Sequence, residues 1–317
     1  MSKKRVITGA LIVLAVVALF LSRMWTSVIF DLAFGALAVI ACLEVSKVAS
    51  ESGKFNSIYF VASYPAVLYL FAMIFINKHY SFNYYIVAYL SVMIVYFLAI
   101  FLTTLISKKS TVNEMGKYVY KGKKWNFALD KAMYSLALLV YPATLFLAII
   151  GLNHINELPV FIAHTNITSG MISTFALVLM FAVTMVCDSM AMITGITFKG
   201  KKLCPKISPN KTISGAIGGL VGGAISALIV YVIFAQFPNF VAEFSAIGGS
   251  IWHIVIIGIM GAVLSQIGDI IASMLKRRAG VKDYGDIFPG HGGVMDRMDG
   301  LIFNAAFILI YFIILAL

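Results

Sequence analysis

Residues 213–235 read ISGAIGGLVGGAISALIVYVIFA, an uncharged apolar run. It is long enough to cross a bilayer, whose hydrocarbon core needs about 20 such residues in a helix. Similar runs recur near residues 6–22, 27–46, 58–76, 83–106, 132–152, 171–194, 250–272 and 298–317. Residues of the set AVILMFWYC make up 61% of the 317-residue chain and charged residues only 12%, which excludes an ordinary soluble protein. The sequence therefore predicts an all-α polytopic membrane protein with about nine transmembrane helices.

Small residues recur in the run at 213–235 with the period of a helix. Gly215, Gly219 and Gly223 follow one another at four-residue spacing, and Gly218 and Gly222 form the neighbouring row. Such rows let two helix backbones approach closely within a membrane. The pattern therefore predicts close helix packing rather than chemistry.

The formal net charge of +11 comes from basic residues between the apolar runs. With a cytoplasmic N-terminus, every Lys and Arg except Arg23 and Lys78 falls on the inside, which predicts an N-in, C-out topology. The location of these basic residues between apolar runs also argues against nucleic acid as a partner.

We expect an N-terminal transmembrane region at 1–131, with about four helices and a basic cytoplasmic loop. We expect a C-terminal catalytic transmembrane region of about five helices at 132–317.

The eighth apolar run ends in SQIGDIIASMLKRR, at residues 265–278. Gln266, Asp269, Ser273 and Lys276 are spaced three, four and three apart, so they share one helical stripe. An ionisable group at membrane depth is costly and marks a candidate site. The stripe predicts a polar function, although Asp269 pairing with Lys276 or with a neighbouring helix is an alternative.

The stretch PGHGGVMDRMDG at 289–300 leads into the last apolar run. Glycines let backbone N–H groups approach a phosphate, and a helix N-terminus adds partial positive charge. Asp296 and Asp299 lie three apart in the first turn and suit a divalent cation shared with phosphate oxygens. The alternative is that these acids complement the helix dipole.

A second inside loop carries Asp188 and then Ser208, Lys211 and Thr212 within SPNKT. Hydroxyls, an ammonium group and free N–H groups at a helix start together suit an anion such as a triphosphate. The alternative is that Ser208 or Thr212 simply caps the seventh helix. In the second run, Glu44 is expected to reach toward the headgroups or to pair with Lys47, not to act in catalysis.

Residues 273–299, read as S-M-L-K-R-x4-K-D-Y-G-D-I-F-P-G-H-G-G-V-M-D-R-M-D, resemble the signature of the phosphatidate cytidylyltransferases, also called CDP-diacylglycerol synthases. The loop at 188–215 resembles two further stretches of that family. It departs from them at Met192, where Tyr is usual, at Ile196, where a basic residue is usual, and at Ser214, where Glu is usual. An extra residue also separates Phe198 from Gly200.

The resemblance implies that phosphatidic acid and CTP form CDP-diacylglycerol and pyrophosphate, by metal-assisted attack of the lipid phosphate on the α-phosphorus of CTP. It implies Mg²⁺ as cofactor, with a second, monovalent cation left open, and metal roles for Asp269, Asp296 and Asp299. The catalytic set adds Lys276 and Arg297. The expected substrate-binding set is Asp188, Ser208, Lys211, Thr212, Ser273, Arg277, His291, Gly292 and Gly293.

The expected location is the cytoplasmic membrane, with the active site at the cytoplasmic side of the C-terminal helices. Membrane lipids and a homodimer are the further expected partners.

A CDP-alcohol phosphotransferase is excluded because apolar residues follow Asn304 where that family needs more acids. A transporter would spread its polar groups across the bilayer midplane, whereas the candidates here gather at the inner ends of spans. A catalytically silent homologue is the other alternative.

Overall fold

The computed structural model describes residues 3–23, 25–51, 98, 102, 139–164, 170–290 and 292–317. The apolar run at 58–76, almost all of the run at 83–106 and the basic loop at 108–131 lie outside the described residues. The chain divides into two compact units. One comprises Met1–Leu147 and Arg278–Asp296, and the other comprises Ala148–Arg277 and Arg297–Leu317. The predicted boundary at 131/132 also lies outside the described residues and stays a prediction.

The described residues of the first unit form two apolar helices, α1 (Lys3–Ser22) and α2 (Val28–Glu51), and a π-helical turn, η1 (Leu139–Thr144). Phe20 of α1 packs edge-on against Phe30 of α2 with ring centroids 6.0 Å apart. One stripe of α2 is buried at three- and four-residue spacing, as a helix with a single packed face requires. The stripe consists of Phe30, Phe34, Ala38, Ala41 and Val45.

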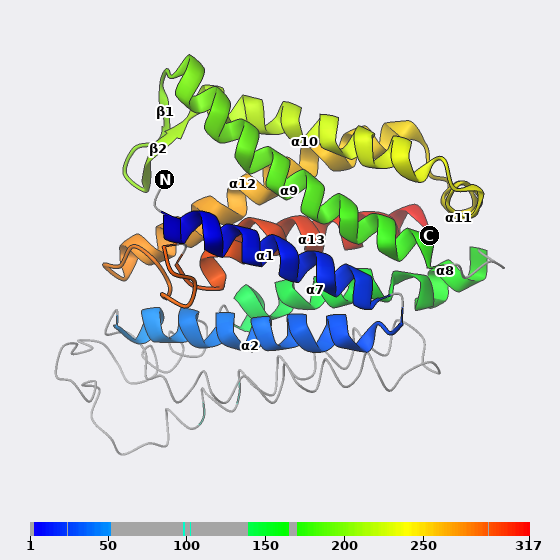
Figure 1. Cartoon of the computed structure of the whole chain (residues 1–317), viewed down its shortest axis with the longest axis horizontal. Helices are drawn as coiled ribbons and strands as arrows, with labels where there is room; N and C mark the ends of the chain where they lie inside the picture. Colours follow the sequence, from blue (N-terminus) through cyan, green and yellow to red (C-terminus); the bar gives the residue numbers. More distant parts are fainter. Residues whose placement is uncertain are drawn as a thin grey trace. The chain divides into compact units, whose positions relative to one another are not determined.

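The second unit holds four long helices (Figure 1): α9 (Met171–Phe198), α10 (Ile213–Phe234), α12 (Ile251–Arg278) and most of α13 (Met295–Leu315). A two-stranded hairpin, β1 (Lys202–Cys204) and β2 (Ser208–Thr212), joins α9 to α10. The short helix α11 (Pro238–Ala246) lies at the other end of the α9–α10 pair. Shorter elements complete the unit: α7 (Leu145–Asn153), η2 (Ile155–Glu157) and α8 (Pro159–His164).

Helices α9 and α10 cross closely because of the predicted glycine rows. A Cβ atom on Gly222 would lie 2.7 Å from the Met190 side chain, and one on Gly218 would overlap the Thr194 side chain. On the neighbouring row, a Cβ on Gly219 would lie 3.0 Å from Cys187 Sγ. Both rows are therefore used for backbone approach, which confirms the packing prediction.

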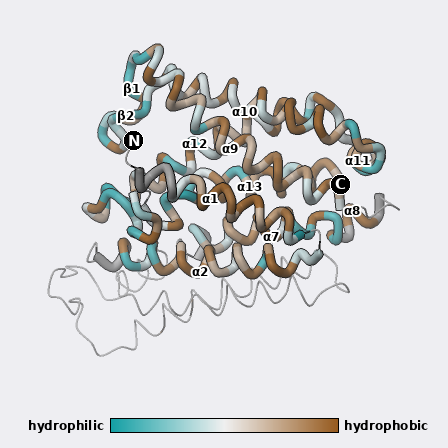
Figure 2. Tube along the Cα trace, in the orientation of Figure 1, coloured by the Kyte–Doolittle hydropathy of each residue, from teal (hydrophilic) through white to brown (hydrophobic). Residues whose placement is uncertain are grey.

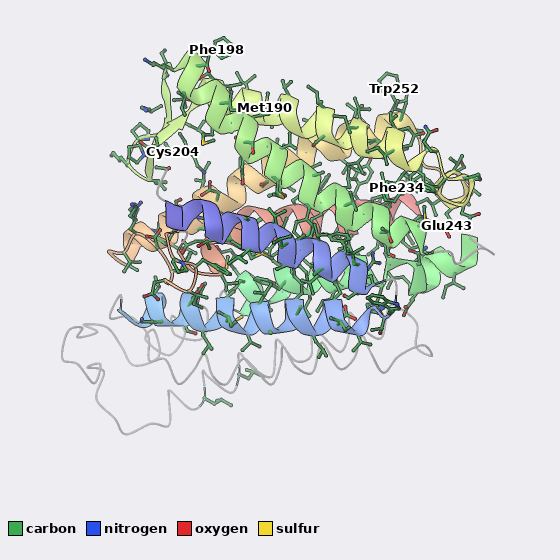
Figure 3. All side chains as sticks on the ribbon, in the orientation of Figure 1. Met190, Phe198, Cys204, Phe234, Glu243 and Trp252 are labelled. Carbon is green, nitrogen blue, oxygen red and sulfur yellow. The ribbon has the colours of Figure 1, made fainter. Side chains whose placement is uncertain are left out.

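An aromatic cluster fills the end of the second unit where α11 lies. The Phe175 ring of α9 has its centroid 5.2 Å from that of Phe234, 4.6 Å from that of Phe240 and 6.3 Å from that of Phe312. Figure 3 places Phe234 and Glu243 at this end and Cys204, in the hairpin, at the opposite end. The aromatic cluster and the polar hairpin thus occupy opposite ends of this unit.

Among the residues that the structure describes, five helices are long and apolar enough to cross a membrane: Val28–Val48, Met171–Phe198, Ile213–Phe234, Ile251–Arg278 and Met295–Leu315. Figure 2 shows their apolar colour beside the hydrophilic hairpin. Shorter apolar helices at Thr8–Ser22 and Tyr141–Asn153 match two further predicted runs. The protein is therefore an integral membrane protein, and the prediction of a helical polytopic fold is confirmed. The number nine and the topology stay predictions.

Candidate active site

Three acidic side chains from three helices interact electrostatically in the second unit. The charge of Asp188 on α9 acts on that of Asp269 on α12, and Asp299 on α13 interacts with both. Asp269 and Asp299 are partly exposed and Asp188 is exposed. The structure thus brings Asp269 and Asp299, two of the three predicted metal ligands, into electrostatic interaction with Asp188 of the predicted substrate-binding set.

Close packing of α12 against α13 accounts for the approach of Asp269 to Asp299. Gly268 precedes Asp269, and a Cβ atom there would overlap the carbonyl oxygen of Asp299. Gly300 follows Asp299, and its added Cβ would lie 2.6 Å from Ser265 Oγ. The glycine beside each acid therefore allows the helix contact that sets the two carboxylates near each other.

The hairpin contributes a cation to this group of acids. Lys211 Nζ lies 2.6 Å from Asp269 Oδ2, and Lys211 is the penultimate residue of β2. The next residue, Thr212, is the N-cap of α10, where its Oγ1 accepts a hydrogen bond from the Gly215 N–H at 3.1 Å. The capping alternative is thus confirmed for Thr212, and the cap fixes the chain at the point from which Lys211 reaches Asp269.

The predicted polar stripe of α12 faces protein groups along its length. Gln266 Nε2 donates to the carbonyl oxygen of Ala216 at 3.2 Å, and Ser273 Oγ donates to Asp269 Oδ1 at 3.4 Å. Lys276 is 8% exposed, and its charge acts on Asp299. Gln266 and Asp269 thus face protein groups, and Lys211 on the neighbouring hairpin pairs with Asp269. The polar function of the stripe stays a prediction.

Within the first unit, the loop before α13 is organised by Asp296. Its carboxylate is buried, and Oδ2 accepts hydrogen bonds from the N–H groups of Tyr284 at 2.8 Å and Gly293 at 2.9 Å. The Phe288 N–H donates to the carbonyl oxygen of Gly292 at 2.9 Å, which closes the Gly-rich turn. Gly292 has a φ of 86°, a left-handed conformation that glycine adopts without strain.

Glu44 of α2 binds the same loop. Its Oε1 accepts a hydrogen bond from the Val294 N–H at 3.0 Å, and its Oε2 accepts one from the Met295 N–H at 2.8 Å. Glu44 is only 7% exposed, so the expectation that it reaches toward the headgroups is wrong. A buried carboxylate is stable here because both oxygens are hydrogen-bonded. The sequence flagged Glu44 as an acid within a span but gave no sign of this distant partner.

The other predicted site residues lie mostly at exposed positions and have fewer interactions with the group of Asp188, Asp269 and Asp299. Arg297 is exposed, and its charge acts on Asp188. Arg277 is exposed at the end of α12, Ser208 is partly exposed in β2, and His291 lies outside the described residues. Met192 and Ile196, two of the departures from the family pattern, are exposed on α9.

The acids provide the hard oxygen donors that Mg²⁺ prefers. Within the described ranges, Asp188 and Asp299 make no ion pair, so two carboxylates beside Asp269 keep ligand capacity. No group of three or more His, Cys, Asp and Glu side chains in that part of the chain has the spacing of a ready-made metal cage.

Comparison with known proteins adds independent information. The sequence pattern of the cytidylyltransferase family matches residues 3–315. The phosphatidate cytidylyltransferase of Rickettsia felis is 45% identical over 129 residues, which are 41% of this chain and 55% of that protein. The protein of that name from Brucella abortus is 40% identical over 135 residues, 43% of this chain and 46% of the relative. The chain spans about half the length of the curated relatives it matches.

Proposed function

The chain belongs to the cytidylyltransferase family, and on that premise we propose that it is a phosphatidate cytidylyltransferase. It would transfer the cytidylyl group of CTP to phosphatidic acid and release pyrophosphate. The strongest support from the structure is the group formed by Asp188, Asp269 and Asp299 beside the ammonium group of Lys211. Acids and cations from several helices at one place suit two strongly anionic substrates.

The reaction is a displacement at phosphorus. A phosphate oxygen of the lipid attacks the α-phosphorus of CTP, a new P–O bond forms, and the bond to the β-phosphate oxygen breaks as pyrophosphate leaves with the electron pair. No general base is needed, because a phosphate monoester is already an anion near neutral pH. The protein therefore has to position the two reactants and neutralise their charge.

The described residues divide that work between acids and cations. Asp269 and Asp299 would hold Mg²⁺, with Asp188 as a further acid near the site, and the ion would supply charge neutralisation at the phosphate oxygens. Lys211, Lys276 and Arg297 would bind phosphate groups. The sequence predicts that Asp296 binds the metal. In this proposal Asp296 instead holds the Gly-rich loop through the N–H groups of Tyr284 and Gly293.

The membrane setting follows from the substrates. The proposed topology is nine helices, N-in and C-out, with the site at the cytoplasmic side of the membrane, where CTP is available and basic loops gather. The acyl chains of phosphatidic acid stay in lipid, so that substrate would enter sideways between helices. Bacterial relatives favour the inner membrane as the location. A homodimer remains part of the proposal.

The test is formation of labelled CDP-diacylglycerol from labelled CTP by the purified protein in micelles that contain phosphatidic acid. Product is expected with Mg²⁺, and little product after chelation by EDTA. Asp299→Asn and Asp188→Asn keep side-chain size and remove charge, so each is expected to lower kcat/KM by about 10²-fold or more.

Lys206→Ala is the matched control, because Lys206 is an exposed hairpin residue outside the acid group. Its activity should stay near that of the native protein. A folded native protein that forms no product with Mg²⁺ would overturn the proposed reaction. Full activity in both Asn variants would overturn the roles given to the carboxylates.

A further inference from the structure

The start of α13 is held by a residue 250 positions earlier in the chain. The helix begins at Met295 and is preceded by Val294, whose side chain carries no hydrogen-bond acceptor for the free N–H groups of the first turn. The two oxygens of Glu44 bind the N–H groups of both residues, at 3.0 and 2.8 Å. Helix α2 thus supplies the cap that the local sequence lacks.

Two glycines of the loop make room for this carboxylate. A Cβ atom on Gly285 would lie 2.6 Å from Glu44 Oε1, and one on Gly293 would overlap the same carboxylate. Neither glycine has a left-handed φ, so space rather than backbone conformation requires glycine at these positions. The loop backbone therefore closes around Glu44.

The carboxylate of Asp296 binds the same loop. It accepts from the N–H groups of Tyr284 and Gly293, so that Gly293, Val294 and Met295 donate three consecutive N–H groups to two acids. These N–H groups are therefore occupied by protein carboxylates. Phosphate binding through them, as the glycine pattern predicts, would require Glu44 and Asp296 to leave.

We propose that Glu44 is a positioning residue for the reaction. By holding Val294 and Met295, it sets where α13 begins and hence how the first turn presents Asp296, Arg297 and Asp299. It does this without touching substrate. This inference rests on the proposed cytidylyltransferase activity, and it assigns phosphate binding to the Lys and Arg side chains, not to the backbone at the start of α13.

The first experiment compares Glu44→Gln with the native protein in the micelle assay. The Gln side chain keeps the size but puts an amide NH₂ group against a backbone N–H, so one hydrogen bond is lost. A shift of about 1 Å in a positioned group can cost about 10²-fold in rate. We expect kcat to fall by about that factor while the KM for CTP changes little.

Hydrogen exchange provides a readout that does not depend on activity. In Glu44→Gln, the amides of Val294 and Met295 should exchange faster than in the native protein. Amides in the middle of α10 should keep their native exchange. This pattern would show that the variant releases the loop without loosening the whole fold.

Glu243→Gln is the matched control. Glu243 is 1% exposed, and its Oε2 accepts from the Ile172 N–H at 3.3 Å, near the start of α9. Asp188 is roughly 24 Å further along that helix at 1.5 Å per residue. The control therefore removes a buried carboxylate at a helix start but leaves the acid group in place, so its kcat should stay native even where its melting temperature falls.

Two results would overturn the inference. One is native kcat together with native exchange of Val294 and Met295 in Glu44→Gln. The other is an equal loss of kcat in Glu44→Gln and Glu243→Gln, because general destabilisation would then explain both. A native protein without product would instead overturn the proposed function, and the exchange comparison would still decide whether Glu44 holds the loop.

Discussion

Lys211 Nζ lies 2.6 Å from Asp269 Oδ2 and joins the hairpin after α9 to the acidic stripe of α12. The ammonium nitrogen is buried, and within the described residues it makes no further hydrogen bond of good geometry. It therefore balances one carboxylate of the acid group and keeps N–H donors for a phosphate oxygen. This position explains why one lysine in a basic hairpin would matter more than its neighbours.

Lys211→Ala should lower kcat/KM for CTP by about 10²-fold, because it removes a charged donor and leaves Asp269 beside two other acids. The measurement is steady-state formation of CDP-diacylglycerol at varied CTP. Lys206→Ala removes the same charge from an exposed position of the hairpin and should have little effect. Equal losses in the two variants would mean that only the net charge of the hairpin matters.

Gly268→Ala tests whether close helix packing sets the distance between Asp269 and Asp299. The added methyl group would overlap the Asp299 carbonyl oxygen and lie 2.7 Å from the Phe303 ring. Overpacking of this kind costs about 1–3 kcal/mol. We expect a lower melting temperature together with reduced activity.

Gly9→Ala is the control for that substitution, because a Cβ atom on Gly9 would meet nothing within 4 Å. Alanine also favours a helix over glycine by about 1 kcal/mol, so this variant should be no less stable than the native protein. Native stability in Gly268→Ala would contradict the packing argument.

Helical periodicity explains how much of this site could be predicted. A period of 3.6 residues places Gln266, Asp269 and Ser273 on one stripe, from which Gln266 binds the Ala216 carbonyl oxygen and Asp269 binds Lys211. The glycine rows of α10 were predictable for the same reason. Both features depend only on residues close together in the sequence.

Contacts between distant segments could not be predicted in this way. The pairing of Lys211 with Asp269 depends on how the hairpin turns toward α12, and the binding of Val294 by Glu44 joins residues 250 positions apart. The loop glycines illustrate the difficulty. Their pattern is typical of phosphate binding, yet here the N–H groups of Gly293, Val294 and Met295 bind two carboxylates, whose oxygens are similar acceptors.

Asn304 is a polar clamp within the apolar part of the second unit. It is fully buried, and its Nδ2 donates to the Met180 carbonyl oxygen and to Thr184 Oγ1, both at 3.0 Å. Such bonds between membrane helices are worth about 0.6 kcal/mol on average and at most about 1.7. Asn304→Ala should therefore lower the melting temperature, and Thr184→Val, which removes one of the two bonds, should lower it less.

The activity of the folded Asn304→Ala protein should remain close to native, because Asn304 lies more than one helical turn beyond Asp299. Parallel measurement of thermal unfolding and of product formation would separate the two effects. A large loss of kcat in a folded sample would place Asn304 in the chemistry and contradict its assignment as a clamp.

Gly285→Ala tests the contact between the loop and Glu44 from the glycine side. The new methyl group would lie 2.6 Å from Glu44 Oε1 and push the carboxylate away from Val294 and Met295. We expect the same pattern as in Glu44→Gln, a lower kcat with little change in the KM for CTP.

The double variant that combines Gly285→Ala with Glu44→Gln decides whether the two substitutions act through one cause or through separate causes. If both substitutions act by releasing the same two N–H groups, their effects overlap, and the double variant should be hardly slower than the worse single variant. Multiplied losses in kcat would show that Gly285 acts independently of Glu44.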